Sequence, residues 1–493
     1  MKRWTLWLAG AAALVAGLVA CPQFAPDDVC GYPGFCGDSS TNPDGGTDAH
    51  PDAPATCPSG NEPKDDPTCV SDALGIFVSP TGSDGNPGTK ESPVATLKTA
   101  LTKAAGKGFI FVCAGSYSES VDIAQSISIF GGFSCNDWTY SASAQPKFTG
   151  TKPDYVFHLN GANQTVIGDI ELDAMDAPAN TGQSSIGAFV ASSQGVTLER
   201  MTIHAGKGAD GVDGMLTPLN AQWPDAGALK GHDAPGADGG TENAVNCPGG
   251  SGTTTGGKGG NADGFTDGQN GLPAIGGGDG GLGGTQTIAC QGGTDGKNGL
   301  AGDAGVAPTS LGDLTGTGWA ALGGTAGAVG GPGQGGGGGG GRDNGSTQGG
   351  GGGGGAGACG GAGGGGGGGG GASIAIASVD SSLSVKASTL ACSNAGNAGS
   401  GASGEAGQLP GGTGGVAQLF PVCSGGNGGN GGSGGGGAGG AGGVSVGVLS
   451  KGGSVNVDSA TQTNTTVGTK GNKGTGAAGN DGIDGVAQAT LAL

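Results

Sequence analysis

The stretch Ser185–Gly214, SIGAFVASSQGVTLERMTIHAGKGADGVDG, decides the fold. It contains two short apolar runs with alternating pattern, a bend after Leu198, and then regularly spaced glycines. Side chains of a strand alternate between its two faces, so each run buries only one or two residues by itself. We therefore expect this stretch to be one turn of a repeating structure, which becomes stable when neighbouring turns stack on it.

The same pattern returns at Ala372–Gly407 and at Val444–Gly485, and an earlier copy lies at Tyr155–Leu172. Strand–turn–strand units with no helix between them favour an all-β fold of stacked parallel strands, a parallel β-helix, over βαβ units. A β-sandwich with long loops is the alternative. A sandwich does not explain why the glycine-rich loops leave each copy at the same place.

Alignment of the copies predicts which residues share a column of the core. One apolar column is expected to contain Phe189, Ile376 and Val448, and another to contain Ile167 and Leu198. Stacked residues of this kind form one continuous apolar spine, because each turn covers the turn before it.

Composition limits the size of the core. The chain has 493 residues, of which 124 are glycine, 34% are hydrophobic and 4% are aromatic. So much glycine without a strict collagen period is typical of low-complexity or disordered segments, so the core involves part of the chain. The net charge of −20 argues against nucleic-acid partners, whose phosphates require clusters of Lys and Arg.

The N-terminus has the pattern of an exported protein. Lys2 and Arg3 precede an apolar segment, Trp4–Ala20, which is short for a membrane span. The segment ends in Leu-Val-Ala-Cys, which resembles a bacterial lipobox. The resemblance implies cleavage before Cys21 and its lipidation, including a palmitate-type acyl chain, and several acyl chains give stable anchoring. Pro22 stands where an Asp would resemble an inner-membrane retention signal, which favours the outer membrane. An ordinary secretory signal is the alternative.

Export also accounts for the twelve cysteines, which lack the spacing of a zinc site. Cys113 and Cys135 each follow an apolar run, and their separation matches one turn of a β-helix, within which stacked positions are close enough for a disulfide. The other pairings are guesses from proximity in sequence, and lipidation of Cys21 would leave an odd number. The candidate disulfides are Cys30–Cys36, Cys57–Cys69, Cys113–Cys135 and Cys392–Cys423.

Composition shifts divide the chain into seven segments. These are a signal peptide (1–20), a flexible cysteine-containing tether (21–74), an N-terminal cap with β-helix turns (75–206), a glycine-rich insertion (207–371), one turn (372–392), a second glycine-rich insertion (393–443), and the C-terminal turns with a last glycine ladder (444–493).

The cap has a recognisable sequence, VSPTGSDGNPGTKESPVATLKTALTKAAGKGFIFVCAGSY, from Val78 to Tyr117. Apolar residues at helical spacing follow Ser92, which we expect to be the N-cap, with Pro93 in the first helical position. These 40 residues resemble the opening of the right-handed parallel β-helix proteins of the pectin-lyase-like superfamily. The resemblance implies a short amphipathic helix that covers the open end of the β-helix.

The glycine ladders have a period of three, the period of polyproline II helices. Glycine-rich segments of this type can pack side by side and hydrogen-bond to one another, as polyglycine II does. Disorder is the alternative, because ordering a residue costs about 1–2 kcal/mol of backbone entropy and glycine loses most. The matching glycines are Gly206, Gly208, Gly211 and Gly214, then Gly399, Gly401, Gly404 and Gly407, and then Gly474, Gly476, Gly479 and Gly482.

One cluster of charged residues emerges from the alignment, which places Asp169 beside Arg200 and Asp173 beside His204. All four side chains are expected to point outward. Polysaccharide lyases of the resembled superfamily use Asp, Arg or Lys on an outer face together with Ca²⁺. The alternative is a ladder of surface charges, each pair contributing well under about 1 kcal/mol.

Asp-Gly pairs recur in the glycine ladders, as at Asp210 and Asp213 and at Asp481 and Asp484. Carboxylates and turn carbonyls are ligands that Ca²⁺ prefers. The pairs match neither the EF-hand nor the nonapeptide calcium repeat, and Asp-Gly is also a common turn pair. No other metal or cofactor is indicated.

Together the patterns resemble the large glycine-rich, PGRS-like surface lipoproteins of Gram-negative bacteria. The resemblance implies a lipoprotein of the outer membrane, exposed on the cell surface, with a structural or adhesive role and with the glycine-rich loops as its interaction surface. Partners would be the membrane, through the lipid, and a polysaccharide or another cell surface. A polysaccharide-active lyase or hydrolase is the alternative, although no catalytic motif stands out; ice or mineral binding by a flat glycine bundle is a third reading.

Overall fold

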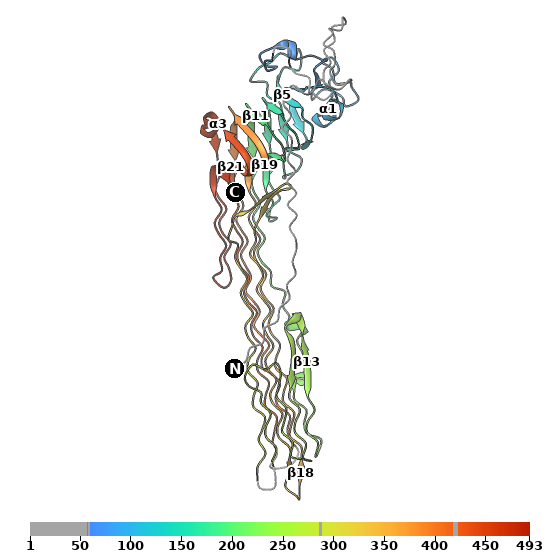
Figure 1. Cartoon of the computed structure of the whole chain (residues 1–493), viewed down its shortest axis with the longest axis vertical. Coiled ribbons are helices and arrows are strands. Elements are labelled where there is room, and N and C mark those ends of the chain that lie inside the picture. Colours follow the sequence, from blue (N-terminus) through green and yellow to red (C-terminus); the bar gives the residue numbers. More distant parts are fainter. Residues whose placement is uncertain (1–56, 58–59, 285–287, 418–422) are drawn as a thin grey trace, which may run out of the picture. The chain divides into compact units, whose positions relative to one another are not determined.

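The computed structural model describes Cys57 and residues 60–284, 288–417 and 423–493. The expectations for the leader, for lipidation at Cys21 and for the Cys30–Cys36 disulfide lie outside these residues. In the described part the chain is all-β: parallel strands dominate and the helices are few and short. Eleven strands form one curled sheet and six form a second (Figure 1).

The strands form three parallel stacks, which we name I, II and III. Stack I contains β4 (Val121–Ile123), β7 (Phe157–Asn160), β10 (Ser185–Ala191), the first halves of β19 (Ser373–Lys386) and β21 (Ser445–Val457), and β23 (Ala487–Ala492). Stack II contains β1 (Gly75–Val78), β2 (Phe109–Cys113), β5 (Ser128–Phe133), β8 (Val166–Gly168), β11 (Val196–Glu199) and the second halves of β19 and β21. Stack III contains β3 (Ser116–Ser118), β6 (Lys147–Thr149), β9 (Glu171–Asp173), β12 (Thr202–Ala205), β20 (Thr389–Cys392) and β22 (Thr465–Thr466).

From β4 onward the chain visits stacks I, II and III in that order, again and again. The long strands β19 and β21 bend from stack I into stack II and so join both in one sheet. Both glycine-rich insertions begin after a strand of stack III and end at a strand of stack I. Each insertion therefore leaves the stacks at the same point of the repeat.

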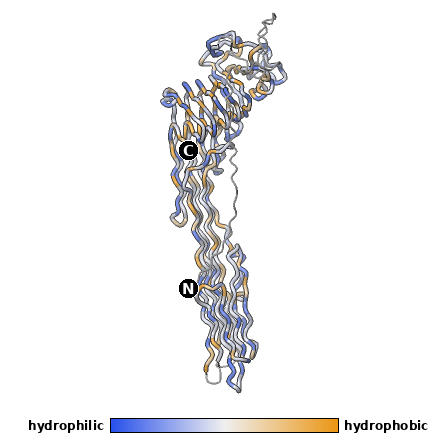
Figure 2. The backbone as a smooth tube through the Cα atoms, viewed as in Figure 1, coloured by the Kyte–Doolittle hydropathy of each residue, from blue (hydrophilic) through white to orange (hydrophobic). Residues whose placement is uncertain are grey.

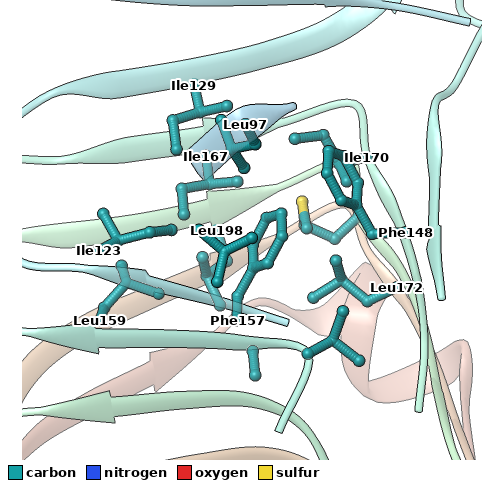
Figure 3. Packing of buried hydrophobic residues seen from close by; sticks show 14 of the residues in the cluster. Leu97, Ile123, Ile129, Phe148, Phe157, Leu159, Ile167, Ile170, Leu172 and Leu198 are labelled. Carbon is teal, nitrogen blue, oxygen red and sulfur yellow. The ribbon is translucent and has the colours of Figure 1, made fainter. Parts of the chain in front are cut away.

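The core lies between the three stacks. Figure 3 shows its centre, where Ile167 and Leu198 of stack II meet Phe157 and Leu159 of stack I and Leu172 of stack III. The register confirms the predicted neighbours Ile167 and Leu198, which are Cα partners. Each turn thus contributes a few apolar side chains to one continuous cluster.

The predicted column of Phe189, Ile376 and Val448 is wrong by one residue. Ile376 and Val448 are partners and lie in the central core, but their partner in β10 is Ala188. Phe189 points to the opposite face and belongs to a second apolar cluster. Since side chains alternate along a strand, a slip of one residue moves a side chain to the other face.

A hairpin from the first insertion covers this second cluster. Its strands are β15 (Gly312–Thr315) and β16 (Gly318–Ala321), and Leu314 is fully buried against the outer face of stack I. Sequence alternation alone indicated one buried face for these strands. Because the hairpin supplies a second cover, both faces of β10 are buried and both carry apolar residues.

The helix α1 (Leu97–Lys103) packs on the first strands of the stacks, with Leu97, Ala100 and Leu101 buried in the core. Its N-cap is Thr96, which corrects the expectation of Ser92. Val94 pairs with Val78 as a short extended bridge, so residues around Pro93 are unavailable for the helix.

The insertions consist mainly of extended segments that lie side by side and hydrogen-bond through their backbones (Figure 1). Successive N–H groups in the segment 349–371 donate to different neighbours: Gly351 to Gly260, Gly352 to Cys423 and Gly353 to His232, at 2.9–3.0 Å. Contacts that return to the same neighbour every third residue have the period of a polyproline II helix. Dense backbone bonding of this kind offsets the entropy that ordered glycines lose.

Each segment's glycine content follows the number of its sides that neighbours cover. In 349–371 three consecutive residues face three neighbours: a Cβ on Gly350, Gly351 or Gly352 would lie 2.0–2.1 Å from a carbonyl oxygen. In the segment 208–214, the glycines at every third position, Gly208, Gly211 and Gly214, face the segment 365–371. Larger side chains therefore lie mainly on the uncovered sides, while the covered positions are mostly glycine and alanine. The long segments of the insertions are mostly pale in Figure 2, the colour of residues of intermediate hydropathy.

The remaining elements are short, and most of them lie in the first insertion, while Pro67–Cys69 precedes β1 and Ser459–Thr463 follows β21. They are the hairpins β13 (Asn243–Cys247) with β14 (Gly252–Gly256) and β17 (Arg342–Asp343) with β18 (Gln348–Gly349), the helices α2 (Ala226–Leu229) and α3 (Ser459–Thr463), and the 3₁₀ turns Pro67–Cys69, Asn220–Gln222 and Pro248–Gly250.

Four disulfides join the described residues: Cys57–Cys69, Cys113–Cys135, Cys247–Cys359 and Cys290–Cys423. The first two agree with expectation. The expected Cys392–Cys423 bond is wrong, because Cys423 pairs with Cys290 of a neighbouring glycine segment. Cys392 is a free thiol that donates to the carbonyl of Val446, and burial raises its pKa to about 12.

Candidate functional site

The four residues of the predicted charged cluster divide into two places. Asp169 and Arg200 occupy equivalent turns between stacks II and III, both with positive φ, of 59° and 50°. Asp173 and His204 are Cα partners in stack III. The pairwise neighbours are as predicted, but the two pairs differ in burial and in bonding.

Arg200 is the centre of the first group. Its Nε lies 3.0 Å from Asp169 Oδ1, and its Nη2 lies 3.0 Å from Asp169 Oδ2, 3.0 Å from Glu62 Oε2 and 2.7 Å from Glu199 Oε1. Tyr140 donates its hydroxyl to Asp169 Oδ1 at 2.8 Å. One guanidinium therefore joins three carboxylates from three parts of the chain.

Asp169 does not point into solvent as expected, since it is 2% exposed. Tyr140 and Arg200 bind its carboxylate, and Glu62 binds the same guanidinium. The alignment could not reveal these bonds, because Tyr140 and Glu62 lie outside the repeated units and no repeat position predicts their contacts. Glu199, adjacent to Arg200, was also missed.

The electrostatics of this group indicate a structural ion-pair network rather than a proton donor or nucleophile. Burial opposes the charge of Arg200, but the hydrogen bonds and the charge of Asp169 outweigh it and raise the guanidinium pKa. Burial raises the pKa of Glu199, and Arg200 only partly opposes this. Burial and the bond to Asp169 raise the pKa of Tyr140 to about 12. The charges of Arg200 and its carboxylate partners therefore stabilise one another.

The second group lies on the outer face of stack III. Lys147 Nζ is 3.1 Å from Glu171 Oε1 and 2.9 Å from Asp173 Oδ2, with side chains 27–40% exposed. His204 is adjacent to Asp173. Exposed ion pairs of this kind contribute about 0–1 kcal/mol each. This face is an open strip of mixed charge.

The aspartates of the Asp-Gly pairs have a structural partner. Asp210 Oδ1 accepts the N–H of Asn397 at 2.6 Å, and Asp213 Oδ1 accepts that of Ser400 at 2.7 Å. Asp481 and Asp484 accept N–H groups in the third ladder, which lowers the pKa of both carboxyls. These side chains satisfy backbone donors at the edge of the bundle, a role that neither the turn reading nor the Ca²⁺ reading includes.

Metal-ligating residues come together at one place in the described ranges, where Cys57, Asp66 and Cys69 are close. Both cysteines are joined in a disulfide, so their sulfurs are not thiolate ligands.

The glycine-rich insertions carry most of the exposed large apolar side chains. Of fourteen such residues in the described chain, nine lie in 207–371 and two in 393–443. The exposed set in the insertions comprises Val212, Met215, Phe265, Leu272, Leu282, Ile288, Leu300, Val306, Leu322, Leu409 and Val416. The interior of the bundle is mostly glycine and alanine, and none of these exposed side chains belongs to an apolar cluster of the described residues.

Comparison with known proteins adds little. No protein-family model matches the chain, and no solved structure matches it. The uncharacterized protein YwoF of Bacillus subtilis (strain 168) is 45% identical over 51 residues, which cover 10% of this chain and 11% of that protein. Within the residues that the structure describes, no helix is long and apolar enough to span a membrane.

Proposed function

We propose that the chain is a lipoprotein of the bacterial outer membrane, anchored through Cys21 and exposed on the cell surface, with a structural or adhesive role. Its body would be a right-handed parallel β-helix, capped by α1, and its glycine-rich insertions, of polyglycine II type, would be the interaction surface. The PGRS-like resemblance and the lipobox support the location. The repeated order of stacks I, II and III supports the β-helix.

The adhesive role is supported mainly by one observation: backbone hydrogen bonds between glycine segments, rather than large side chains, hold the insertions together. The segments are held together by backbone hydrogen bonds at closely packed glycines, so the side chains at the outer positions are not needed for this packing. Eleven large apolar residues are nevertheless exposed there. Exposed apolar side chains mark a contact site where they form a contiguous patch, so the adhesive role requires that some of these residues lie together on the surface of the bundle.

The Arg200 group supports the adhesive proposal over the enzyme alternative. Its carboxylates are engaged by one guanidinium, and Asp169 is sealed from solvent. A lyase requires a base that reaches its substrate. The alternative is tested by incubating the protein with neutral and acidic polysaccharides and Ca²⁺ and assaying for new reducing ends.

The location is tested by metabolic palmitate labelling of cells that express the chain. The wild type is expected to be labelled, to fractionate with the outer membrane and to be degraded by protease added to intact cells, while Cys21→Ser loses the label. An unlabelled wild type, or one protected in intact cells, contradicts the location.

The adhesive role is tested on the same cells with the triple variant Leu272→Ser, Leu282→Ser and Leu300→Ser. Adherence to cells or matrix polymers is expected to fall. A matched control changes three exposed apolar residues outside the insertions, Met175, Val467 and Leu493, to serine. Equal adherence of the triple variant and the wild type contradicts the role assigned to the insertions.

A further inference from the structure

A cavity of about 340 Å³ lies beside the hairpin β15–β16. Its walls come from the hairpin, from the chain that leads into β10, and from the glycine segments around Val212 and Gly368. The hairpin is held in place because Leu314 is buried against the outer face of stack I. The cavity is therefore a feature of packed elements rather than of a free loop.

The lining contains both apolar and polar side chains. Trp319, Ile186 and Val212 are apolar and include an indole ring, while Asp154 and Gln183 bring a carboxylate and a carboxamide. Asp154 is the one charged group among the lining residues, and the charge of Lys152 acts close to it. The lining thus has no cationic side chain that would attract an anionic ligand. The charge of Asp154 is partly neutralised by Lys152, so its attraction for a cationic ligand is weakened.

One donor at this wall is unsatisfied. The indole Nε1 of Trp319 is buried and has no hydrogen-bond partner among the described residues. Buried indole N–H groups usually have a partner. Because this nitrogen is closed to solvent, an oxygen acceptor in the cavity reaches it only after the ring turns.

We propose that this cavity binds a neutral saccharide unit at the end or branch of a glycan. The indole face suits the C–H face of a pyranose ring, and the planar carboxylate and carboxamide suit pairs of adjacent hydroxyls. The volume is at the low end of the roughly 300–1,000 Å³ of small-molecule sites, which suits one or two sugar units. The inference rests on the proposed adhesive function and gives it a ligand class.

The test measures binding to the full lipidated chain in detergent by isothermal titration calorimetry. The probes are cellotetraose, mannotetraose and chitotetraose, with trigalacturonate as the acidic comparator. The wild type is expected to bind at least one neutral probe and not trigalacturonate. Trp319→Ala and Gln183→Ala are each expected to weaken binding by about tenfold or more, and Gln183 lies outside the hairpin, so its variant leaves the hairpin intact.

The matched control is Trp223→Ala, which removes another half-buried indole that does not line the cavity. Its affinity is expected to equal that of the wild type. The proposal is overturned if no neutral probe binds, if trigalacturonate binds instead, or if Trp319→Ala and Gln183→Ala bind as the wild type does. Cells that carry Gln183→Ala and still adhere normally would refute this site while leaving the adhesive function intact.

Discussion

Replacement of a single glycine by alanine distinguishes a hydrogen-bonded bundle from a loose chain. Gly330 and Gly331 are adjacent in one segment, but a Cβ on Gly330 would lie 2.1 Å from the carbonyl oxygen of Gly432, whereas a Cβ on Gly331 would have no atom nearer than 3.4 Å. Gly330→Ala therefore forces two segments apart, and Gly331→Ala does not. The pair is its own matched control.

The magnitude follows from the bonds at this point. Separation disturbs the N–H of Gly330 to the carbonyl of Gly361 and the N–H of Gly432 to the carbonyl of Gly331, both at 2.9 Å. Two hydrogen bonds contribute about 1–3 kcal/mol and overpacking costs about 1–3 kcal/mol. Alanine restores about 0.4–1 kcal/mol by restricting the unfolded chain. The net loss for Gly330→Ala is about 1–5 kcal/mol, while Gly331→Ala is neutral or slightly stabilising.

Cleavage by thermolysin measures this local free energy. The exposed Leu300 is a cleavage site on the neighbouring segment, and its carbonyl accepts the N–H of Gly331. When opening and closing are fast relative to cleavage, the rate reports the population of the open form. Gly330→Ala is expected to be cut at least about fivefold faster than the wild type, and Gly331→Ala no faster. Equal rates for the two variants would refute the packing that we describe.

Three further predictions follow from other contacts. The Cys247–Cys359 disulfide closes a long loop onto the central segment, so Cys359→Ser is expected to lower the free energy of unfolding by about 2–5 kcal/mol in urea titrations, and an unchanged midpoint would contradict this. Arg200→Gln leaves a buried carboxylate without its cation and is expected to lower the free energy of unfolding by about 3–5 kcal/mol. Lys147→Ala breaks exposed ion pairs and is expected to lower it by about 0–1 kcal/mol. Similar losses for the two variants in thermal melts would contradict the structural role of the Arg200 network. Burial raises the pKa of Glu199, so the contribution of this carboxyl to stability is fully present below its unfolded pKa and is lost as the pH rises through its folded pKa. Glu199→Gln is expected to flatten this part of the plot of unfolding free energy against pH. An unaltered plot would contradict the raised pKa of Glu199.

The stacked strands could be predicted from sequence because each turn repeats the same alternation. The partners Ile167 with Leu198 and Asp173 with His204 follow from aligning the copies. The error at Phe189 has a specific cause. Both faces of β10 are buried and carry apolar residues, so the alternation of apolar and polar residues no longer shows which face points to the central core. Only the hairpin, which lies far along the chain, explains the second buried face.

The candidate site could be predicted only in part, because some of its bonds come from outside the repeat. The pairing of Asp169 with Arg200 could be predicted, but the bonds of Tyr140 to Asp169 and of Glu62 to Arg200 depend on contacts between segments that share no pattern. Similarly, Cys423 was assigned to the nearer Cys392, although its partner Cys290 is 133 residues away. Sequence proximity cannot reveal which glycine segments become neighbours.

Hydrogen exchange of the segment 349–371 in the intact chain tests the central claim most directly. Its glycine amides donate to carbonyls of surrounding segments, so we expect slow exchange, comparable to that of the strands β10 and β19. Exchange at the rate of an unstructured peptide would contradict the account, because the segment would then have no hydrogen-bonded neighbours.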